Sequence, residues 1–276
     1  MTAPAESGEL KRCCAALYES DFARMLLGDS FHPGGLRLTA RLGGQLGLRP
    51  GLCVLDVASG KGESAIFLAG QFGCHVVGVD FGPENVREAN ARAEAAQVAH
   101  LVSFVEGDAE RLGFSDASFD AVICECAFCT FPDKRAGASE FARVLRPGGG
   151  VGLSDLTRSG PLPEDLDGLL AWIACIADAR PVEEYASYLE AAGFGVTTIE
   201  PQNNALAEMA RDVQGRLLGL ELMARLNRVD LPGADFEQAK HFARAASKAI
   251  QQGLLGYSLI VARVGTILQT IENGCS

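Results

Sequence analysis

The stretch CVLDVASGKG, residues 53–62, runs from an apolar strand through a glycine-containing turn into the start of a helix. Glycines let a backbone approach a ligand closely, and a helix N-terminus offers free N–H groups. The pattern acid-x-Ala-x-Gly-x-Gly differs from the dinucleotide-binding G-x-G-x-x-G and lacks the G-K-[ST] of a P-loop. On its own it also permits a structural turn that packs a helix on a strand.

Short apolar runs alternate with helical segments on both sides of this turn. Strands are expected at 53–58, 74–81, 102–108, 119–128, 148–156, 196–201 and 254–264, and helices at 10–27, 36–48, 163–179, 203–226 and 234–252. Continuous apolar strands separated by helices predict a doubly covered, Rossmann-like α/β fold with a parallel sheet. The last two strands have only helices between them, which suits an antiparallel final strand.

The domain organisation expected from this pattern is simple. Residues 1–48 form an N-terminal helical cap, and residues 49–276 form the main domain, with a helical insertion at 203–252 before the last strand. No internal repeat or low-complexity linker divides the chain.

Composition narrows the range of partners. The 276 residues include 35 acidic and 24 basic side chains, giving a formal charge of −11 and no Lys/Arg run, so nucleic acid is not expected as a substrate. No run of 18 apolar residues predicts a membrane span, and the opening MTAPAESGELKRCC lacks the apolar core of a signal peptide. We therefore expect a cytoplasmic protein with reduced thiols that acts on a small molecule; the oligomeric state stays open.

Acidic residues follow three successive strands. Besides Asp56, Asp80 ends the second strand, where a carboxylate can take both hydroxyls of a ribose, and Asp108 follows the third, where it can accept from an adenine amino group. Ligands of open parallel sheets bind at the carboxyl ends of the strands. Each acid taken singly could be a helix N-cap, but together they predict one crevice for a nucleoside-containing cofactor.

Four motifs carry a resemblance to a known family. DVASGKG, GVDF, GDAERLGFSDASFDAVICECAF and RVLRPGGGVGLSDL, within residues 50–160, resemble the class I S-adenosylmethionine-dependent methyltransferases in order and spacing. The resemblance implies a seven-stranded sheet with an antiparallel last strand. This sequence differs from the family pattern at Ala58, where the family usually has glycine. The residues it assigns to S-adenosylmethionine are Asp56, Ala58, Ser59, Gly60, Gly62, Asp80, Phe81, Asp108, Ala109 and Glu125.

The chain has nine cysteines, a high number for a cytosolic protein. Cysteines inside expected strands, such as Cys124, are interpreted as buried small hydrophobic residues. Cys126 and Cys129 follow at the end of the fourth strand, which in a methyltransferase faces the transferred methyl group, and Cys175 lies on the expected helix 163–179.

A second, narrower resemblance concerns these cysteines. ECAFCTFPDK is similar to the N-C-x-x-N-L-x-P-D-K stretch of arsenite methyltransferases, and ACIADA to their segment with the second substrate-binding cysteine. It implies that Cys126 and Cys175 bind trivalent arsenic, and it leaves Cys129 either as a third thiolate or as a packing residue. Soft arsenic prefers thiolates, so lowered thiol pKa values are expected. That family's further cysteine pair has no matching counterpart here, because the surroundings of Cys13 and Cys14 differ. A related group acting on a thiol, selenium or tellurium species is therefore also open.

Two further alternatives remain at this stage. The enzyme could methylate a small organic acceptor with Glu125 or His32 as the base and the cysteines as packing residues. It could also be a binding module that keeps the fold without catalysis. The four histidines have no metal-ligand spacing with one another or with a cysteine pair, so no metal site is expected.

Overall fold

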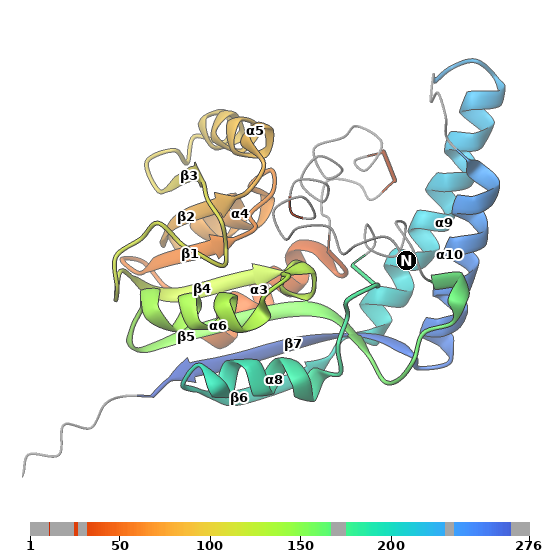
Figure 1. Ribbon diagram of the computed structural model, residues 1–276. Helices are drawn as coiled ribbons and strands as arrows, with labels where there is room; N and C mark the ends of the chain where they lie inside the picture. Colours follow the sequence, from red (N-terminus) through yellow and green to blue (C-terminus); the bar gives the residue numbers. More distant parts are fainter. Residues whose placement is uncertain (1–10, 12–24, 27–31, 167–174, 230–234, 266–276) are drawn as a thin grey trace, which may run out of the picture.

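The computed structural model describes residues 11, 25–26, 32–166, 175–229 and 235–265. In this part of the chain seven strands form one sheet in the order β3-β2-β1-β4-β5-β7-β6 (Figure 1). The strands are β1 Cys53–Val57, β2 His75–Asp80, β3 Val102–Glu106, β4 Phe119–Glu125, β5 Leu145–Arg158, β6 Phe194–Pro201 and β7 Leu255–Val264. Strands β1 to β5 pair in parallel, whereas β7 is antiparallel to both neighbours. The predicted α/β fold with an antiparallel last strand is confirmed.

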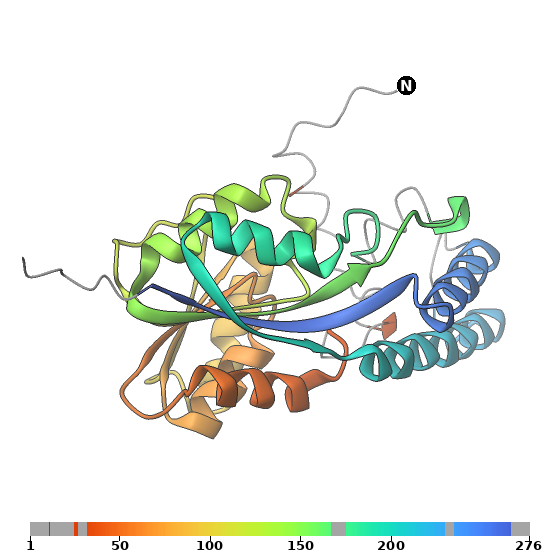
Figure 2. The same ribbon diagram turned by 90° about the horizontal axis from the view of Figure 1, so that it is seen from below.

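Helices cover both faces of this sheet. The helices are α3 Gly35–Leu46, α4 Glu63–Phe72, α5 Pro83–Ala95, α6 Lys134–Val144, α8 Val182–Ala191, α9 Asn203–Arg225 and α10 Phe236–Gln251. Figure 2 shows α3 and α4 on one face of the sheet and α6 and α8 on the other. Central strand residues such as Leu55 and Ile123 are therefore fully buried, as continuous apolar strands require.

Helix α3 packs directly on β5. A Cβ atom added to Gly152 would come within 2.8 Å of Leu42, and one added to Gly150 within 2.9 Å of Leu46. The absence of side chains at these two glycines therefore allows the close approach. This contact fixes the part of the expected N-terminal cap that the structure describes. Most of the expected helix 10–27 lies outside the described residues, and the boundary at residue 48 stays a prediction.

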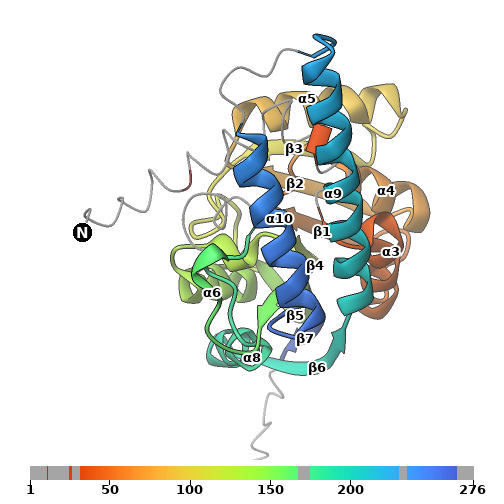
Figure 3. The same ribbon diagram turned by 90° about the vertical axis from the view of Figure 1, so that its right-hand side faces the viewer.

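The expected helical insertion is a hairpin of two long helices. Helices α9 and α10 lie side by side and project beyond the sheet (Figures 1 and 3). Gln214 of α9 donates hydrogen bonds to Ser247 Oγ at 2.7 Å and to the Ala243 carbonyl at 3.0 Å. None of the helices in the described ranges is long and apolar enough to cross a membrane.

Two expected elements are interrupted by a residue with a left-handed backbone. Strand β4 stops at Glu125 instead of residue 128, because Cys126 has φ +53° and the short 3-10 helix η1, Phe128–Thr130, follows. The expected helix 163–179 is not continuous to its end. After the 3-10 helix η2, Glu164–Leu166, and the undescribed residues 167–174, Cys175 has φ +60° and begins a turn. A left-handed residue cannot continue a strand or a right-handed helix, so both cysteines lie at sharp bends.

Candidate active site

The turn after β1 is held tightly against the end of β2. Ser59 N–H donates to the Val79 carbonyl at 3.1 Å, and Gly62 N–H closes the turn on the Ser59 carbonyl at 2.9 Å. Ala58 has φ +58°, in the left-handed region that favours glycine. Gly62 begins helix α4, and a Cβ atom there would come within 2.4 Å of Phe104. Gly62, with φ +81°, therefore meets both a backbone and a packing requirement, whereas Ala58 adopts the left-handed conformation despite its Cβ atom.

Carboxylates crowd the cavity beside this turn. Asp80 is 8% exposed, and its Oδ2 accepts from Gly60 N–H and its Oδ1 from Gly82 N–H, both at 2.8 Å. Asp56 is buried, and its Oδ2 has no hydrogen-bond partner among the described residues. Burial, followed by the charges of Glu125 and Asp80, raises the pKa of Asp56 well above its usual range. This wall of the cavity favours a cationic ligand, because a positive charge offsets the repulsion among the acids.

The predicted cofactor residues gather around one cavity. With the exception of Gly62, all of them line it: Asp56, Ala58, Ser59, Gly60, Asp80, Phe81, Asp108, Ala109 and Glu125. The buried Ser59 Oγ, like Asp56 Oδ2, has no partner among the described residues. Two unsatisfied polar atoms on one cavity wall indicate a polar ligand, since such atoms are normally hydrogen-bonded.

Lys11 reaches the cavity from the N-terminal region, which sequence reasoning did not foresee. Its Nζ lies 2.8 Å from both carboxylate oxygens of Asp108 and 2.5 Å from Glu110. Burial opposes ionisation of Asp108, but the hydrogen bonds from Lys11 and from the Glu110 N–H outweigh it and lower the pKa of Asp108. An adenine amino group at Asp108 would therefore share this carboxylate with an ammonium.

Glu125, the last residue of β4, lies in a cluster of hydroxyls from three elements. Its carboxylate accepts from Ser64 Oγ of α4 at 2.7 Å and from Thr39 Oγ1 of α3 at 3.0 Å, with Ser154 Oγ of β5 at 3.4 Å. His32 Nε2 lies 3.6 Å from Glu125 Oε2, and the buried His32 Nδ1 has no partner among the described residues. His32 also lines the cavity, and its Nε2 lies 3.5 Å from the hydroxyl oxygens of Thr39 and Ser64, so the imidazole belongs to the same polar cluster as Glu125.

The three predicted thiols come together next to Glu125. Cys126 lines the cavity, and Cys175 Sγ donates to the Cys126 carbonyl at 3.5 Å although the residues are 49 positions apart. Hydrogen bonding to the Cys175 thiol, then burial, raises the pKa of Cys126 well above its usual value, and burial, then the Cys175 thiol, does the same for Cys129. The expected lowering of the thiol pKa values is therefore wrong for Cys126 and Cys129, because both thiols are buried beside another thiol and near acidic groups.

The cysteines differ in their access to the cavity. Cys129 and Cys175 are buried and do not line the cavity, whereas Cys126 does. Cys124 is fully buried within β4, in agreement with its interpretation as a packing residue. Within the described ranges, no three or more His, Cys, Asp or Glu side chains are placed to hold a metal ion. The thiols are therefore a contacting cluster and do not form a preorganised three-ligand site.

Comparison with known proteins identifies the family. A sequence profile described as a methyltransferase domain matches residues 54–149. The 27-O-demethylrifamycin SV methyltransferase of Amycolatopsis mediterranei is 31% identical over 259 residues, which cover 88% of this chain and 93% of that protein. The chain belongs to the class I S-adenosylmethionine-dependent methyltransferases.

Two other similar proteins are methyltransferases that act on different substrates. An arsenite methyltransferase of Halobacterium salinarum is 34% identical over 164 residues, but the match spans 57% of this chain and 41% of that protein. A phosphoethanolamine N-methyltransferase of Haemonchus contortus, solved with S-adenosyl-L-methionine, has the same fold, with a TM-score of 0.76, 19% identity, and coverage of 96% of this chain and 61% of that chain.

The cavity of the methyltransferase fits the cofactor of its class. S-adenosylmethionine supplies an electrophilic methyl group on a sulfonium, and it also carries an ammonium, two ribose hydroxyls and an adenine. The acids Asp56 and Asp80 suit these cationic and hydroxyl groups, and the unpartnered Ser59 Oγ can accept or donate. Individual assignments to parts of the cofactor stay proposals. The hydroxyl partners of Glu125 were missed because nothing in the sequence links Thr39 or Ser64 to it.

Proposed function

We propose that this methyltransferase transfers the methyl group of S-adenosylmethionine to trivalent arsenic, as arsenite or methylarsenite, held by Cys126 and Cys175. The observation that carries the proposal is the hydrogen bond from the Cys175 thiol to the Cys126 carbonyl at 3.5 Å, which joins two distant segments at the point where Cys126 lines the cofactor cavity. The similarity to an arsenite methyltransferase over part of the chain supports the same substrate class.

The raised thiol pKa values are compatible with arsenic binding. When arsenous acid binds two thiols, two As–S bonds replace two As–O bonds, and each thiol proton leaves with a hydroxide as water. A preformed thiolate is therefore not required. Soft sulfur ligands bind soft arsenic in preference to harder atoms such as oxygen that could also accept a methyl group. Cys126 places the arsenic beside the cavity, and its lone pair can attack in line without a base, so positioning is the main contribution of the protein.

Direct binding measurements test this proposal. Reduced protein containing S-adenosylhomocysteine is titrated calorimetrically with arsenite, as wild type, as the Cys126→Ser/Cys175→Ser double variant and as the control Cys53→Ser. Cys53 lies at the start of β1 and does not line the cavity. We expect tight binding by wild type and control and loss in the double variant, because hydroxyls do not replace soft thiolates. Absent binding by wild type, or equal binding by all three proteins, contradicts the proposal.

A second candidate function is methyl transfer to a hydroxyl of a small organic acceptor, with His32 as the base. It is favoured by the position of His32 on the cavity wall and by the similarity to a rifamycin methyltransferase along most of the chain. Glu125 already accepts from hydroxyls of neighbouring elements and is therefore less suited than His32 to act as the base. Radiolabelled S-adenosylmethionine with a panel of phenols and hydroxylated polyketides tests it: His32→Asn should abolish labelling that Cys126→Ser leaves intact.

A further inference from the structure

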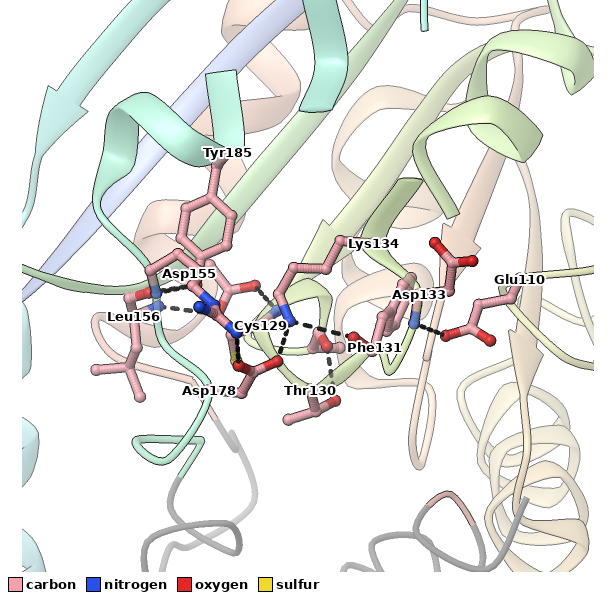
Figure 4. Close-up of polar contacts among 12 residues, drawn as sticks. Glu110, Cys129, Thr130, Phe131, Asp133, Lys134, Asp155, Leu156, Asp178 and Tyr185 are labelled. Carbon is pink, nitrogen blue, oxygen red and sulfur yellow. Dashed lines mark hydrogen bonds and ion pairs between the residues drawn. The ribbon is translucent and has the colours of Figure 1, made fainter. Parts of the chain in front are cut away.

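A buried ion pair joins the two segments that carry the thiols. Lys134, the first residue of α6, is 5% exposed; its Nζ donates to the Phe131 carbonyl at 3.1 Å and pairs with the Asp178 carboxylate (Figure 4). Lys134 lies five positions after Cys129 and Asp178 three positions after Cys175. The pair therefore connects the two bends at a short chain distance from the thiols on each side.

Further hydrogen bonds anchor both segments to the end of β5. On one side, Asp155 Oδ2 accepts from Cys129 N–H and its Oδ1 from Leu156 N–H, both at 2.9 Å (Figure 4). On the other side, the Arg180 guanidinium also pairs with Asp178, and the backbone N–H of Arg180 donates to Tyr185 Oη at 3.0 Å. The Tyr185 hydroxyl then donates to the Leu156 carbonyl at 2.9 Å. Lys134 and Asp178 close this network by joining its two arms directly.

The Lys134–Asp178 ion pair is better explained by the fixed position that it gives to its two segments than by a contribution to the stability of the fold. A buried ammonium requires a partner, and buried ion pairs are often no more stabilising than apolar side chains of similar volume. What such a pair does impose is a fixed position for both partners. In the described part of the chain, Lys134–Asp178 is the ion pair that joins residues 126–134 to residues 175–180.

We propose that Lys134 and Asp178 are positioning residues that hold Cys175 against Cys126 and Cys129. Without the pair, the segment of Cys175 can move away from the bend after β4, and the two thiols no longer share one substrate atom. The consequence for arsenic rests on the proposed function, whereas the spacing of the thiols does not.

A bridging reagent measures the spacing independently of catalysis. Dibromobimane becomes fluorescent only after both of its bromomethyl groups have alkylated thiols, with two C–S bonds formed and two bromides and two protons released. The rate in reduced wild type, corrected for the rate in Cys175→Ser, reports bridging that involves Cys175. In Lys134→Met we expect this rate to fall roughly tenfold or more, since a displacement of about 1 Å has effects of that size on reactions between fixed groups.

Matched variants separate positioning from general damage. Lys134→Arg restores the charge and should recover most of the bridging rate. Lys240→Met removes a comparable ammonium, 16% exposed and paired with Glu221 and Glu237 in the α9–α10 hairpin, and should bridge at the wild-type rate. Affinity for S-adenosylhomocysteine serves as the test of folding, and we expect it to be unchanged in Lys134→Met and Lys240→Met.

Each outcome decides the proposal. Wild-type bridging in a Lys134→Met protein that binds S-adenosylhomocysteine normally would overturn it. If Lys134→Met does not fold, Asp178→Asn decides in the same way, because it keeps the size of the side chain and removes the charge. A wild type that does not bind arsenite while Lys134→Met still slows bridging refutes the arsenic substrate and leaves the positioning role standing. Normal arsenite affinity with normal bridging in Lys134→Met refutes the positioning role alone.

Discussion

Replacing Ala58 with glycine should stabilise the protein, although glycine usually destabilises. Ala58 has φ +58° in the turn after β1, and it is the position where the methyltransferase class usually has glycine. Gly60, two residues later, has φ +52°, and a Cβ atom added there would meet nothing within 4 Å. Both positions therefore have a left-handed backbone, but one holds alanine and the other holds glycine.

The magnitude follows from two opposing terms. A left-handed backbone costs a residue with a Cβ atom about 1–2 kcal/mol, whereas glycine loses about 0.4–1 kcal/mol more than alanine in conformational entropy on folding. Ala58→Gly should therefore raise the free energy of unfolding by roughly 0.5–1 kcal/mol. Gly60→Ala has open space for the new methyl group, so it should lower that free energy by a similar amount through backbone strain alone.

The assay is thermal and urea unfolding of both variants and wild type without ligand. A change of this size corresponds to a shift in Tm of roughly 1–3 °C, up for Ala58→Gly and down for Gly60→Ala. Calorimetry with S-adenosylhomocysteine should show that Ala58→Gly binds at least as tightly as wild type, because the substitution removes only a methyl group from the cavity wall. A lower Tm for Ala58→Gly, or a raised one for Gly60→Ala, would refute the assignment of strain to this turn.

Three further predictions concern buried groups. Burial, chiefly, raises the pKa of Asp155 to about 7, so the folded state holds a proton that the unfolded state has lost above about pH 4. Wild type should lose about 1.4 kcal/mol of stability per pH unit between pH 4 and 7 relative to Asp155→Asn; parallel curves of unfolding free energy against pH would contradict this. Asp80→Ala should weaken S-adenosylhomocysteine binding by on the order of 2 kcal/mol in calorimetry, because the hydrogen bonds to the ribose hydroxyls are lost. An unchanged affinity would contradict the proposed role of Asp80 in binding the ribose. Gly78→Ala should lower the free energy of unfolding by about 1–3 kcal/mol in urea titration, because its Cβ atom would come within 2.2 Å of Phe104; a neutral effect would show that Phe104 can move.

The fold could be predicted from the sequence because its signals are local. Apolar strands alternate with helices at fixed periods, so the expected helices at 203–226 and 234–252 differ from α9 and α10 by at most two residues at each end. The predicted ends of the fourth strand and of the helix 163–179 were wrong because a single residue bends the chain there. Cys126 and Cys175 adopt positive φ values, and neither residue type signals such a bend.

The candidate site could be predicted only where one motif carries several residues. The cofactor turn and the strand-end acids follow from short patterns, and nearly all of these residues line the cavity. The hydrogen bonds of these acids join residues that are far apart in the sequence. Lys11 and Asp108 are separated by 97 positions, and Thr39 and Glu125 by 86. No periodicity links such residues, so their pairing depends on how the helices pack against the sheet.

The end of β4 brings two different chemistries to one cavity. Glu125 lies in the cluster with hydroxyls and His32, whereas Cys126, the next residue, contacts the thiol of Cys175. A hydroxyl acceptor must lose a proton during methyl transfer, so the rate of its methylation depends on His32 as the base. When arsenous acid binds two thiols, the thiol protons leave as water before methyl transfer. The arsenic lone pair then forms the As–C bond while the C–S bond of the sulfonium breaks and S-adenosylhomocysteine leaves. The rate with arsenite should therefore be insensitive to His32→Asn, whereas a large loss of that rate in His32→Asn would favour the hydroxyl acceptor.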